Sequence, residues 1–254
     1  MSSCSLRNLT LKTAFLLLLA SAKRVSELHG ISYDVLWALD GSSATLSLSP
    51  DFVAKTQIPG DPSSAYKPFV IPALASSVGH DEPDRLLCPL RALKCYLQRT
   101  VSSRPKCSRL FVSSASTLKH KQVTKNTISL WIRSVIKAAY SSVSQEDLSL
   151  WKITAHEVRA IATSILFRQN QSLKQVMSAA SWKSNSTFVS FYLRDLNHKS
   201  LDLSSIGPIV AAQAIVNPQA STSSDPQDPR SISSRSRKEK GRGVPQSKLR
   251  PARN

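Results

Sequence analysis

Glycine is scarce in this chain, with seven glycines among 254 residues. The Gly-x-Gly pattern occurs once, at Gly241–Gly243, in a polar C-terminal segment and not after an apolar strand. The glycine-rich loops that bind dinucleotides or nucleoside triphosphates need their glycines directly after a strand. The sequence therefore predicts no nucleotide cofactor.

Cysteine is also rare, and the four residues are Cys4, Cys88, Cys95 and Cys107. They form no Cys-x-x-Cys pair, and no His-x-x-x-His motif accompanies them. Structural zinc sites depend on such closely spaced ligands. We therefore expect no bound metal, and we expect reduced intracellular thiols instead of disulfides.

Long apolar runs are absent, and the best candidate spans only residues 14–22. It follows Arg7 and Lys12 and ends in small residues, as secretory signal peptides do. The run is too short to cross a bilayer. Residues 23–28 continue its helical pattern, which favours a buried domain helix and no membrane association.

Acidic residues are few: 16 Asp and Glu stand against 34 Lys and Arg, a formal net charge of +18. An excess of this kind favours a polyanionic partner, most often nucleic acid. Residues 225–254 hold nine Lys or Arg and three acids, a net of +6, which leaves +12 for the rest of the chain. The basic character therefore belongs to the body of the protein as well as to its tail.

Composition divides the chain into a body, residues 1–216, and a tail, residues 217–254. The tail is rich in Ser, Pro and Arg and has almost no large apolar residues, so we expect it to be disordered. Its basic run, 235–240, is typical of a nuclear import signal or a non-specific DNA contact, although a solubilising tail has the same composition.

The body predicts an α+β fold that is mostly α. Helical periodicity covers residues 9–28 as one helix. Alternating patterns predict strands at 31–37 and 44–48, with Asp40-Gly41 as the hairpin turn. Residues 68–72, with a proline at each end, predict a third strand at an edge. The result is a small three-stranded antiparallel sheet near the N-terminus.

After Pro89 the pattern is helical. Five helices are expected, containing residues 90–97, 128–139, 153–167, 173–180 and 186–196. Thr124 is a predicted N-cap, and Thr154 followed by Glu157 forms a capping box that predicts a helix start at Thr154. In the last helix, Phe188 and Phe191 are expected to face the core.

The helix start at Thr154 is a candidate anion site. His156 lies in its first turn, and Arg159 follows three residues later on the same face. First-turn N–H groups and a guanidinium suit a phosphate, and an imidazole exchanges protons near neutral pH. An ordinary exposed helix start has the same pattern, so this pair alone is a weak signal.

Residues suited to phosphoryl transfer follow one another in a specific order along the body. In chain order they are Arg24, Glu27, Lys55, His156, Arg159, Trp182 and Tyr192. This set, within residues 9–201, resembles the catalytic domain of tyrosine recombinases, the phage-integrase family. In that family an Arg ends an early helix and a Lys lies in a hairpin of a three-stranded sheet. Segments 180–188 and 191–194 are most similar to recombinases of DIRS-type and Ngaro-type retrotransposons of eukaryotes.

The resemblance implies an enzyme that breaks and rejoins DNA through a covalent 3′-phosphotyrosine. Tyr192 is the expected nucleophile, and His156 is the expected general base. Lys55 is the expected general acid that protonates the departing 5′ oxygen. Lys67 also lies beside the third strand and remains the alternative. No cofactor takes part in this chemistry.

The remaining residues of the set would bind the scissile phosphate. Arg24 and Arg159 are expected to bind its non-bridging oxygens, and Trp182 to donate its indole N–H to the same group. Glu27 is expected to orient Arg24. Trp182 and Tyr192 are ten residues apart, one more than in many family members.

The resemblance also implies partners. Duplex DNA is the expected substrate, with no small-molecule substrate, and the active form is expected to be a homo-tetramer on two duplexes in the nucleus. Residues 206–216 are a candidate helix for exchange between subunits, or for packing on their own domain. The separate N-terminal DNA-clamping domain of the family is expected to be absent, as in a fragment, a truncated element copy or a domesticated descendant.

Three alternative functions remain open at this point. The chain fits a DNA-binding module of the same fold that no longer cuts. It also fits a type IB topoisomerase-like enzyme, which shares the chemistry without joining two duplexes. A basic interaction protein unrelated to this family is the third and most distant alternative.

Overall fold

The structure is a computed structural model of the 254-residue chain. It describes residues 4–55, 57–58, 60–61, 65–74, 86–104, 107–113, 121–141, 154–170, 172–182 and 184–193. All of them belong to one compact unit, Met1–Pro218. The expected tail 217–254, its basic run 235–240 and the expected helix 206–216 lie outside the described residues, so these three remain predictions.

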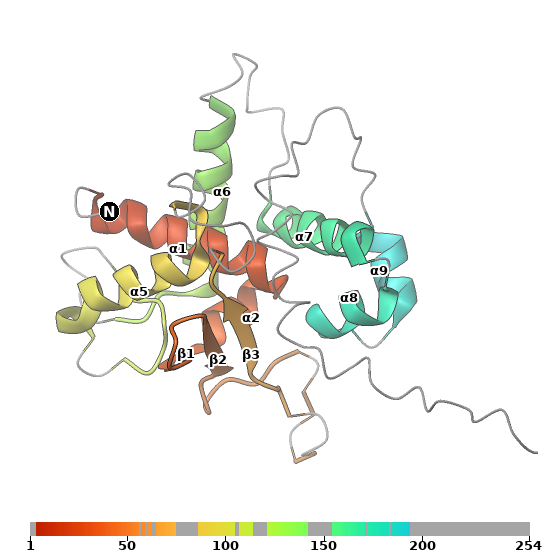
Figure 1. Ribbon diagram of the computed structural model, residues 1–254, viewed down its shortest axis with the longest axis horizontal. Coiled ribbons are helices and arrows are strands. Elements are labelled where there is room, and N and C mark those ends of the chain that lie inside the picture. The colour runs from red at the N-terminus through yellow and green to blue at the C-terminus, as the bar shows by residue number, and fades with distance from the viewer. Residues whose placement is uncertain are drawn as a thin grey trace, which may run out of the picture. The chain divides into compact units, whose positions relative to one another are not determined.

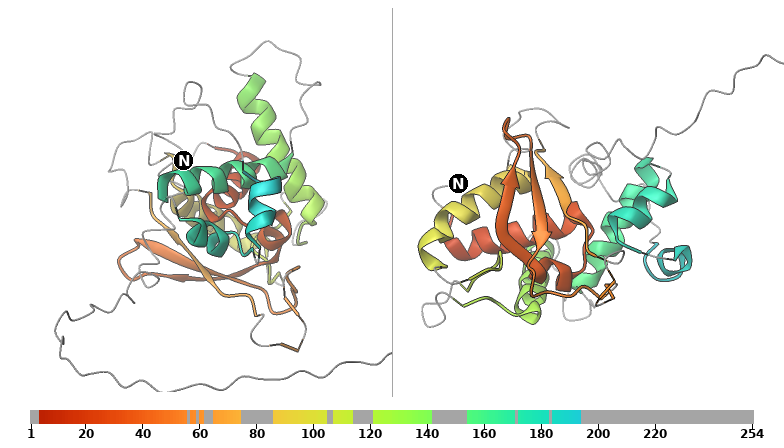
Figure 2. Two further views of the ribbon diagram at one scale, coloured as in Figure 1. Left: turned by 90° about the vertical axis from the view of Figure 1, so that its right-hand side faces the viewer. Right: turned by 90° about the horizontal axis from the view of Figure 1, so that it is seen from below.

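The fold is α+β and mostly helical, with one small antiparallel sheet, as predicted (Figure 1). The helices are α1 (Leu6–Ser21), α2 (Val25–Gly30), α5 (Pro89–Thr100), α6 (Lys125–Ser141), α7 (Ala155–Asn170), α8 (Leu173–Ala179) and α9 (Asn185–Phe191). The strands are β1 (Ile31–Trp37), β2 (Ser43–Leu48) and β3 (Phe69–Pro72). Both views in Figure 2 show the sheet lying against the helical part of the fold.

The sheet has the strand order β1-β2-β3, and both pairs are antiparallel. Trp37 pairs with Ala44 next to the predicted turn, where Gly41 has a φ of +70° that suits glycine. The third strand is an edge strand, and Pro72 stands at its end opposite Ser43. The three predicted strands are therefore confirmed, and the prolines lie where a missing N–H is tolerated.

The prediction of one continuous helix over residues 9–28 is wrong, because the chain breaks between α1 and α2. Ala22 takes a left-handed φ of +51°, and its N–H donates to the carbonyl of Leu18 at 3.1 Å. Arg24 then caps the next helix, donating its own N–H to the Glu27 carboxylate at 2.8 Å. Both helices bury their apolar faces in one core, so the hydrophobic pattern runs through the break without marking it.

Helix α1 is the central helix of the core. Residues 16–21 are buried without interruption, and α1 packs against α5, α6 and α7. This is the environment expected of a buried domain helix. Among the described residues, no helix combines the length and the apolar character that crossing a bilayer requires.

The later helices follow the prediction with shifted ends. Thr124 caps α6, since its hydroxyl accepts the N–H of Thr127 at 3.2 Å. Helix α7 begins at Ala155, and α9 runs from Asn185 only to Phe191. Phe188 is buried, but Phe191 is 66% exposed, which contradicts its expected core position. The helix ends there, and the next side chain, Tyr192, packs inward in its place.

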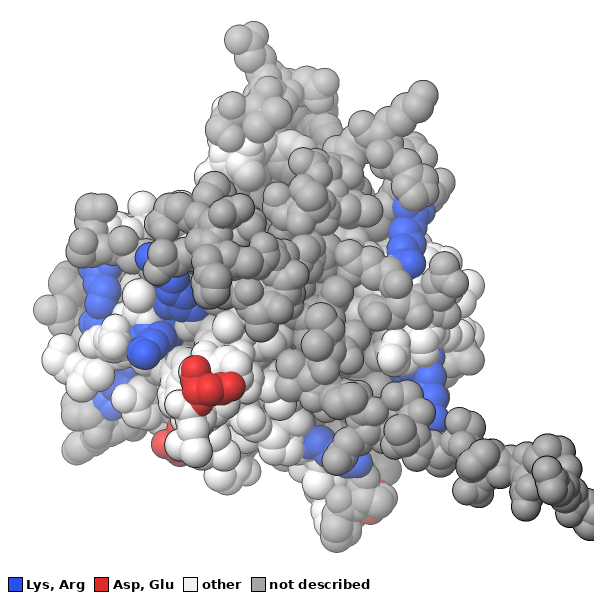
Figure 3. All heavy atoms as spheres, viewed as in Figure 1, with Lys and Arg blue, Asp and Glu red and all other residues white. Residues whose placement is uncertain are grey.

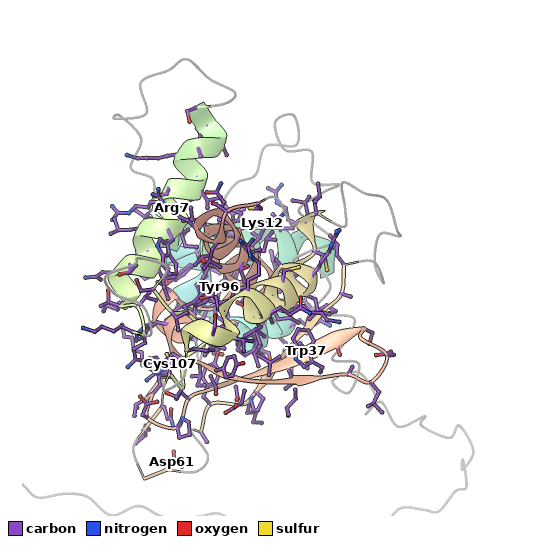
Figure 4. All side chains as sticks on the ribbon, turned by 90° about the vertical axis from the view of Figure 1, so that its left-hand side faces the viewer. Arg7, Lys12, Trp37, Asp61, Tyr96 and Cys107 are labelled. Atoms are coloured by element: carbon purple, nitrogen blue, oxygen red, sulfur yellow. The ribbon has the colours of Figure 1, made fainter. Side chains whose placement is uncertain are left out.

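We predict that Tyr96→Phe destabilises the fold by about 1–3 kcal/mol. The Tyr96 side chain is fully buried on α5 in the centre of the fold, and its hydroxyl accepts the Val112 N–H at 3.1 Å (Figure 4). Phenylalanine would leave that buried N–H without an acceptor. Urea unfolding monitored by circular dichroism measures the difference.

Tyr33→Phe is the matched control. Tyr33 and Tyr96 both stack on the guanidinium of Arg104, at 4.4 and 5.6 Å from their ring centres. The Tyr33 ring is half-buried, and replacing it keeps the stacking. We expect a change below about 0.5 kcal/mol. Equal losses in both variants would contradict the role given to the Tyr96 hydroxyl.

Candidate active site

A cavity of about 410 Å³ lies where segments far apart in the chain meet. Its walls come from the start of α2, the turn after β2, the starts of α6 and α7, and the end of α9. Five of the seven predicted site residues line it: Arg24, Lys55, His156, Arg159 and Tyr192. We call this space the basic cavity.

Arg24 and Glu27 form an ion pair at the start of α2. The guanidinium Nη1 donates to Glu27 Oε1 at 2.6 Å, while the backbone N–H of Arg24 donates to Oε2 at 2.8 Å. The Glu27 side chain is 1% exposed, whereas that of Arg24 is 21% exposed and faces the cavity. Glu27 thus fixes Arg24 from behind and does not line the cavity itself.

Arg159 is a buried cation on α7 with unused hydrogen-bonding capacity. The residue is 2% exposed, and its Nη2 donates to the carbonyl of Ala180 at 2.5 Å. Its Nε and Nη1 are buried and have no acceptor among the described residues. Burial, followed by repulsion from Arg24, lowers the pKa of Arg159 to about 10. The group therefore stays charged at neutral pH.

Trp182 packs beside this guanidinium. Its ring centre lies 4.7 Å from the Arg159 guanidinium carbon, and its backbone N–H donates to Met177 at 2.9 Å. The indole Nε1 is a second buried donor that lacks an acceptor within the described part of the chain. Buried N–H groups are rarely left unpaired, since each costs about 1–3 kcal/mol. A cluster of unpaired donors of this kind suits an anion whose oxygens accept these hydrogen bonds.

Tyr192 follows the last residue of α9 and is half-buried. Its ring packs against His156, at 4.6 Å between ring centres, and against Trp182, at 4.5 Å. The Arg159 guanidinium carbon is 5.4 Å from the same ring. The predicted nucleophile, general base, one phosphate-binding Arg and the indole donor therefore form one contiguous cluster.

The two candidate general acids differ in position. Lys55 is exposed, lies in the turn after β2 and lines the basic cavity. Lys67 is also exposed, but it is not among the lining residues. The geometry thus favours Lys55 over Lys67 as the lysine that can reach a bound phosphate.

Sequence reasoning missed one buried residue of the site, Lys23. Its Nζ donates to the carbonyl of Ala179 at 2.9 Å and to the hydroxyl of Ser181 at 3.1 Å, and it also lines the cavity. A helix continued through residues 23–28 gives no reason to expect a buried lysine. The feature that would have predicted its burial is the helix break at Ala22, and hydrophobic periodicity does not reveal that break.

The cavity is strongly positive. Cationic lining residues come from four segments, and among the described residues no Asp or Glu side chain joins them in the lining. On the face in Figure 3, blue Lys and Arg side chains cover more of the described surface than red Asp and Glu side chains do. In the described ranges, no group of His, Cys, Asp or Glu is placed to hold a metal ion. The positive lining suits a phosphate or polyphosphate ligand.

Comparison with known proteins gave no match, either to a protein-family model or to a curated protein. The resemblance to tyrosine recombinases therefore rests on the sequence alone, and it stays a prediction.

We predict that inorganic phosphate stabilises the protein through the basic cavity. Phosphate would supply acceptors for the free donors of Arg159 and Trp182. At about ten times its Kd it should raise Tm by about 3 °C over chloride at the same ionic strength. Differential scanning fluorimetry measures this rise.

Two variants locate the phosphate effect. Arg159→Met should abolish the phosphate-specific rise, because it removes the buried donors. Arg133→Met, an exposed position on α6 outside the cavity lining, should keep it. A rise that persists in Arg159→Met would place phosphate elsewhere on the protein.

Proposed function

We propose that this protein breaks and rejoins duplex DNA as a tyrosine recombinase, with Tyr192 as the nucleophile. The observation that carries the proposal is the grouping of Tyr192 with the free buried donors of Arg159 and Trp182 at a cavity that Arg24 also lines. The mostly helical α+β fold with its three-stranded sheet supports the proposal.

The first step in this proposal is phosphate binding. A scissile phosphodiester enters the basic cavity, and its non-bridging oxygens accept hydrogen bonds from Arg159, Arg24 and the Trp182 indole. The two guanidinium groups neutralise charge that grows on these oxygens during transfer. Because the donors are already fixed by packing and by Glu27, little reorganisation accompanies the reaction.

The second step is the exchange of one phosphorus–oxygen bond for another. The Tyr192 hydroxyl oxygen attacks phosphorus, and its proton passes to His156. The bond from phosphorus to the 5′ oxygen breaks, and Lys55 donates a proton to that oxygen. The products are a 3′-phosphotyrosine and a free 5′ hydroxyl, and no oxidant or nucleotide is consumed.

The covalent intermediate conserves the energy of the broken bond. Attack by a 5′ hydroxyl on the phosphotyrosine reverses the step and regenerates Tyr192. When the hydroxyl comes from a second duplex, the reversal is strand exchange. We therefore propose duplex DNA as the substrate, a homo-tetramer on two duplexes as the active assembly, and the nucleus as the site of action.

We predict a covalent protein–DNA adduct on a nicked suicide substrate. The nick lets the short 5′ hydroxyl strand diffuse away, so the phosphotyrosine accumulates. The wild-type chain should give a slowly migrating band on a denaturing protein gel. Tyr192→Phe should give none, because it lacks the attacking oxygen, while its gel-shift affinity for DNA should be unchanged within about twofold.

An absent adduct together with intact, salt-sensitive DNA binding would contradict the enzymatic proposal. It would leave a DNA-binding module with a phosphate-binding cavity. An adduct that persists in Tyr192→Phe would assign the attack to another residue.

We further predict that Lys55→Ala slows adduct formation by about 10²–10⁴-fold. A substrate with sulfur in place of the scissile 5′ oxygen should restore the rate, because a thiolate departs without a proton. Lys67→Ala is the matched control and should cleave both substrates at the wild-type rate. Slow cleavage in Lys67→Ala that sulfur corrects would move the general-acid role to Lys67.

A further inference from the structure

Lys23 is a buried lysine that the proposed reaction does not use. It is 5% exposed and lies in the break between α1 and α2. Its ammonium donates to the carbonyl of Ala179, the last residue of α8, and to the hydroxyl of Ser181, two residues later. The aromatic rings of Tyr66 and Phe69 flank it, each with its centre 5.2 Å from Nζ.

The titratable groups around Lys23 come from three further segments. Glu27 and Arg24 face it from α2, Arg159 from α7, and Tyr66 from the segment before β3. Burial lowers the pKa of Lys23 to about 8. Attraction to Glu27 raises this pKa, while repulsion from Arg159 and Arg24 lowers it further. Burial raises the pKa of Tyr66, which therefore stays neutral.

The residues that Lys23 holds form a strained turn, residues 179–181. Ser181 has a left-handed φ of +52°, which is unfavourable for a residue with a side chain. Lys23 binds the first and last residues of this turn, and Arg159 binds the carbonyl of Ala180 between them. Two cations, Lys23 from the break between α1 and α2 and Arg159 from α7, thus hold three consecutive residues immediately before Trp182.

We propose that Lys23 is a positioning residue: its ammonium holds the 179–181 turn and thereby sets the place of Trp182 and of the Tyr192 ring that packs on it. The contact that transmits this effect is the ring pair Trp182–Tyr192, 4.5 Å between centres. The consequence for DNA cleavage rests on the proposed function, whereas the position of Trp182 does not.

The strength of the Lys23 hydrogen bonds to the 179–181 turn should depend on pH. Below its pKa, Lys23 donates charge-assisted hydrogen bonds, which are about twice as strong as neutral ones. As the pH rises through about 8, the amine loses its proton and its hold on Ser181 weakens. The Trp182 environment should change over the same range, and cleavage should become slower above it.

Fluorine NMR of protein labelled with fluorotryptophan tests the position of Trp182 without DNA. The chain has four tryptophans, and Trp182→Phe identifies the resonance. In the wild type it should shift with a midpoint near pH 8. In Lys23→Met and Lys23→Arg that midpoint should be absent, because neither side chain titrates there.

Lys12→Met is the matched control. Lys12 is a partly buried lysine on α1 whose pKa is also lowered by burial, and it lies outside the cavity lining (Figure 4). In Lys12→Met, the Trp182 resonance should shift with pH as it does in the wild type. Methionine at position 23 would lie between the Tyr66 and Phe69 rings, an environment that accepts an apolar chain. If Lys23→Met does not fold, the test compares the Trp182 resonance of the wild type with that of Lys23→Arg.

Adduct formation on the suicide substrate supplies the second measurement. Lys23→Met should slow it by about 10- to 100-fold, the cost of a small misplacement in an active site. Lys23→Arg should retain most of the rate and lose the decline above pH 8 that the pKa of Lys23 predicts.

The two proposals fail in different ways. A Trp182 resonance that does not move near pH 8, or that moves equally in Lys23→Met, would overturn the role of Lys23. Wild-type cleavage rates in Lys23→Met would overturn it as well. A resonance that titrates as expected, with no adduct from any variant, would support the role of Lys23 and contradict the cleavage function.

Discussion

The site depends on one physical constraint, a buried positive charge with too few acceptors. Arg159 is 2% exposed and leaves two guanidinium nitrogens without a partner among the described residues. Arg24 lies close enough to disfavour its charge further, and Arg159 in turn disfavours the charge of Lys23. Within the described part of the chain, Glu27 is the carboxylate that attracts Arg159 and Lys23 and pairs with Arg24. A fold that keeps three cations around one anion is not optimised for its own stability. A bound anion would offset this excess of positive charge, which supports the proposed phosphate-binding role of the cavity.

Local pattern predicted most of the fold because most elements carry a local signal. Strands β1 and β2 alternate around a glycine turn, and Thr124 marks the start of α6. The break after Ser21 could not be predicted in this way, because α1 and α2 share one hydrophobic core. Phe191 was placed wrongly for a related reason: the end of α9 is fixed by the packing of Tyr192, which periodicity does not describe.

The candidate site was predictable as a set of residue types but not as a geometry. His156 and Arg159 are neighbours on one helix, so sequence alone joins them. Arg24 and Lys55 reach the cavity only through the tertiary fold, and the choice between Lys55 and Lys67 needed their positions relative to the cavity. Lys23 carried no signal, since its burial follows from the helix break and from its contact with a turn more than 150 residues away.

The strained backbone positions lie next to the buried cations of the candidate site. Among the described residues, the non-glycine positions with a left-handed φ are Ala22 and Ser181. Such conformations cost about 1–3 kcal/mol each and persist where the surrounding structure enforces them. Lys23 follows the first strained residue and binds the second, while Arg159 holds the carbonyl next to it. Since strain concentrates at functional sites, its location at the two turns joined by Lys23 supports the proposal that this junction positions the candidate site.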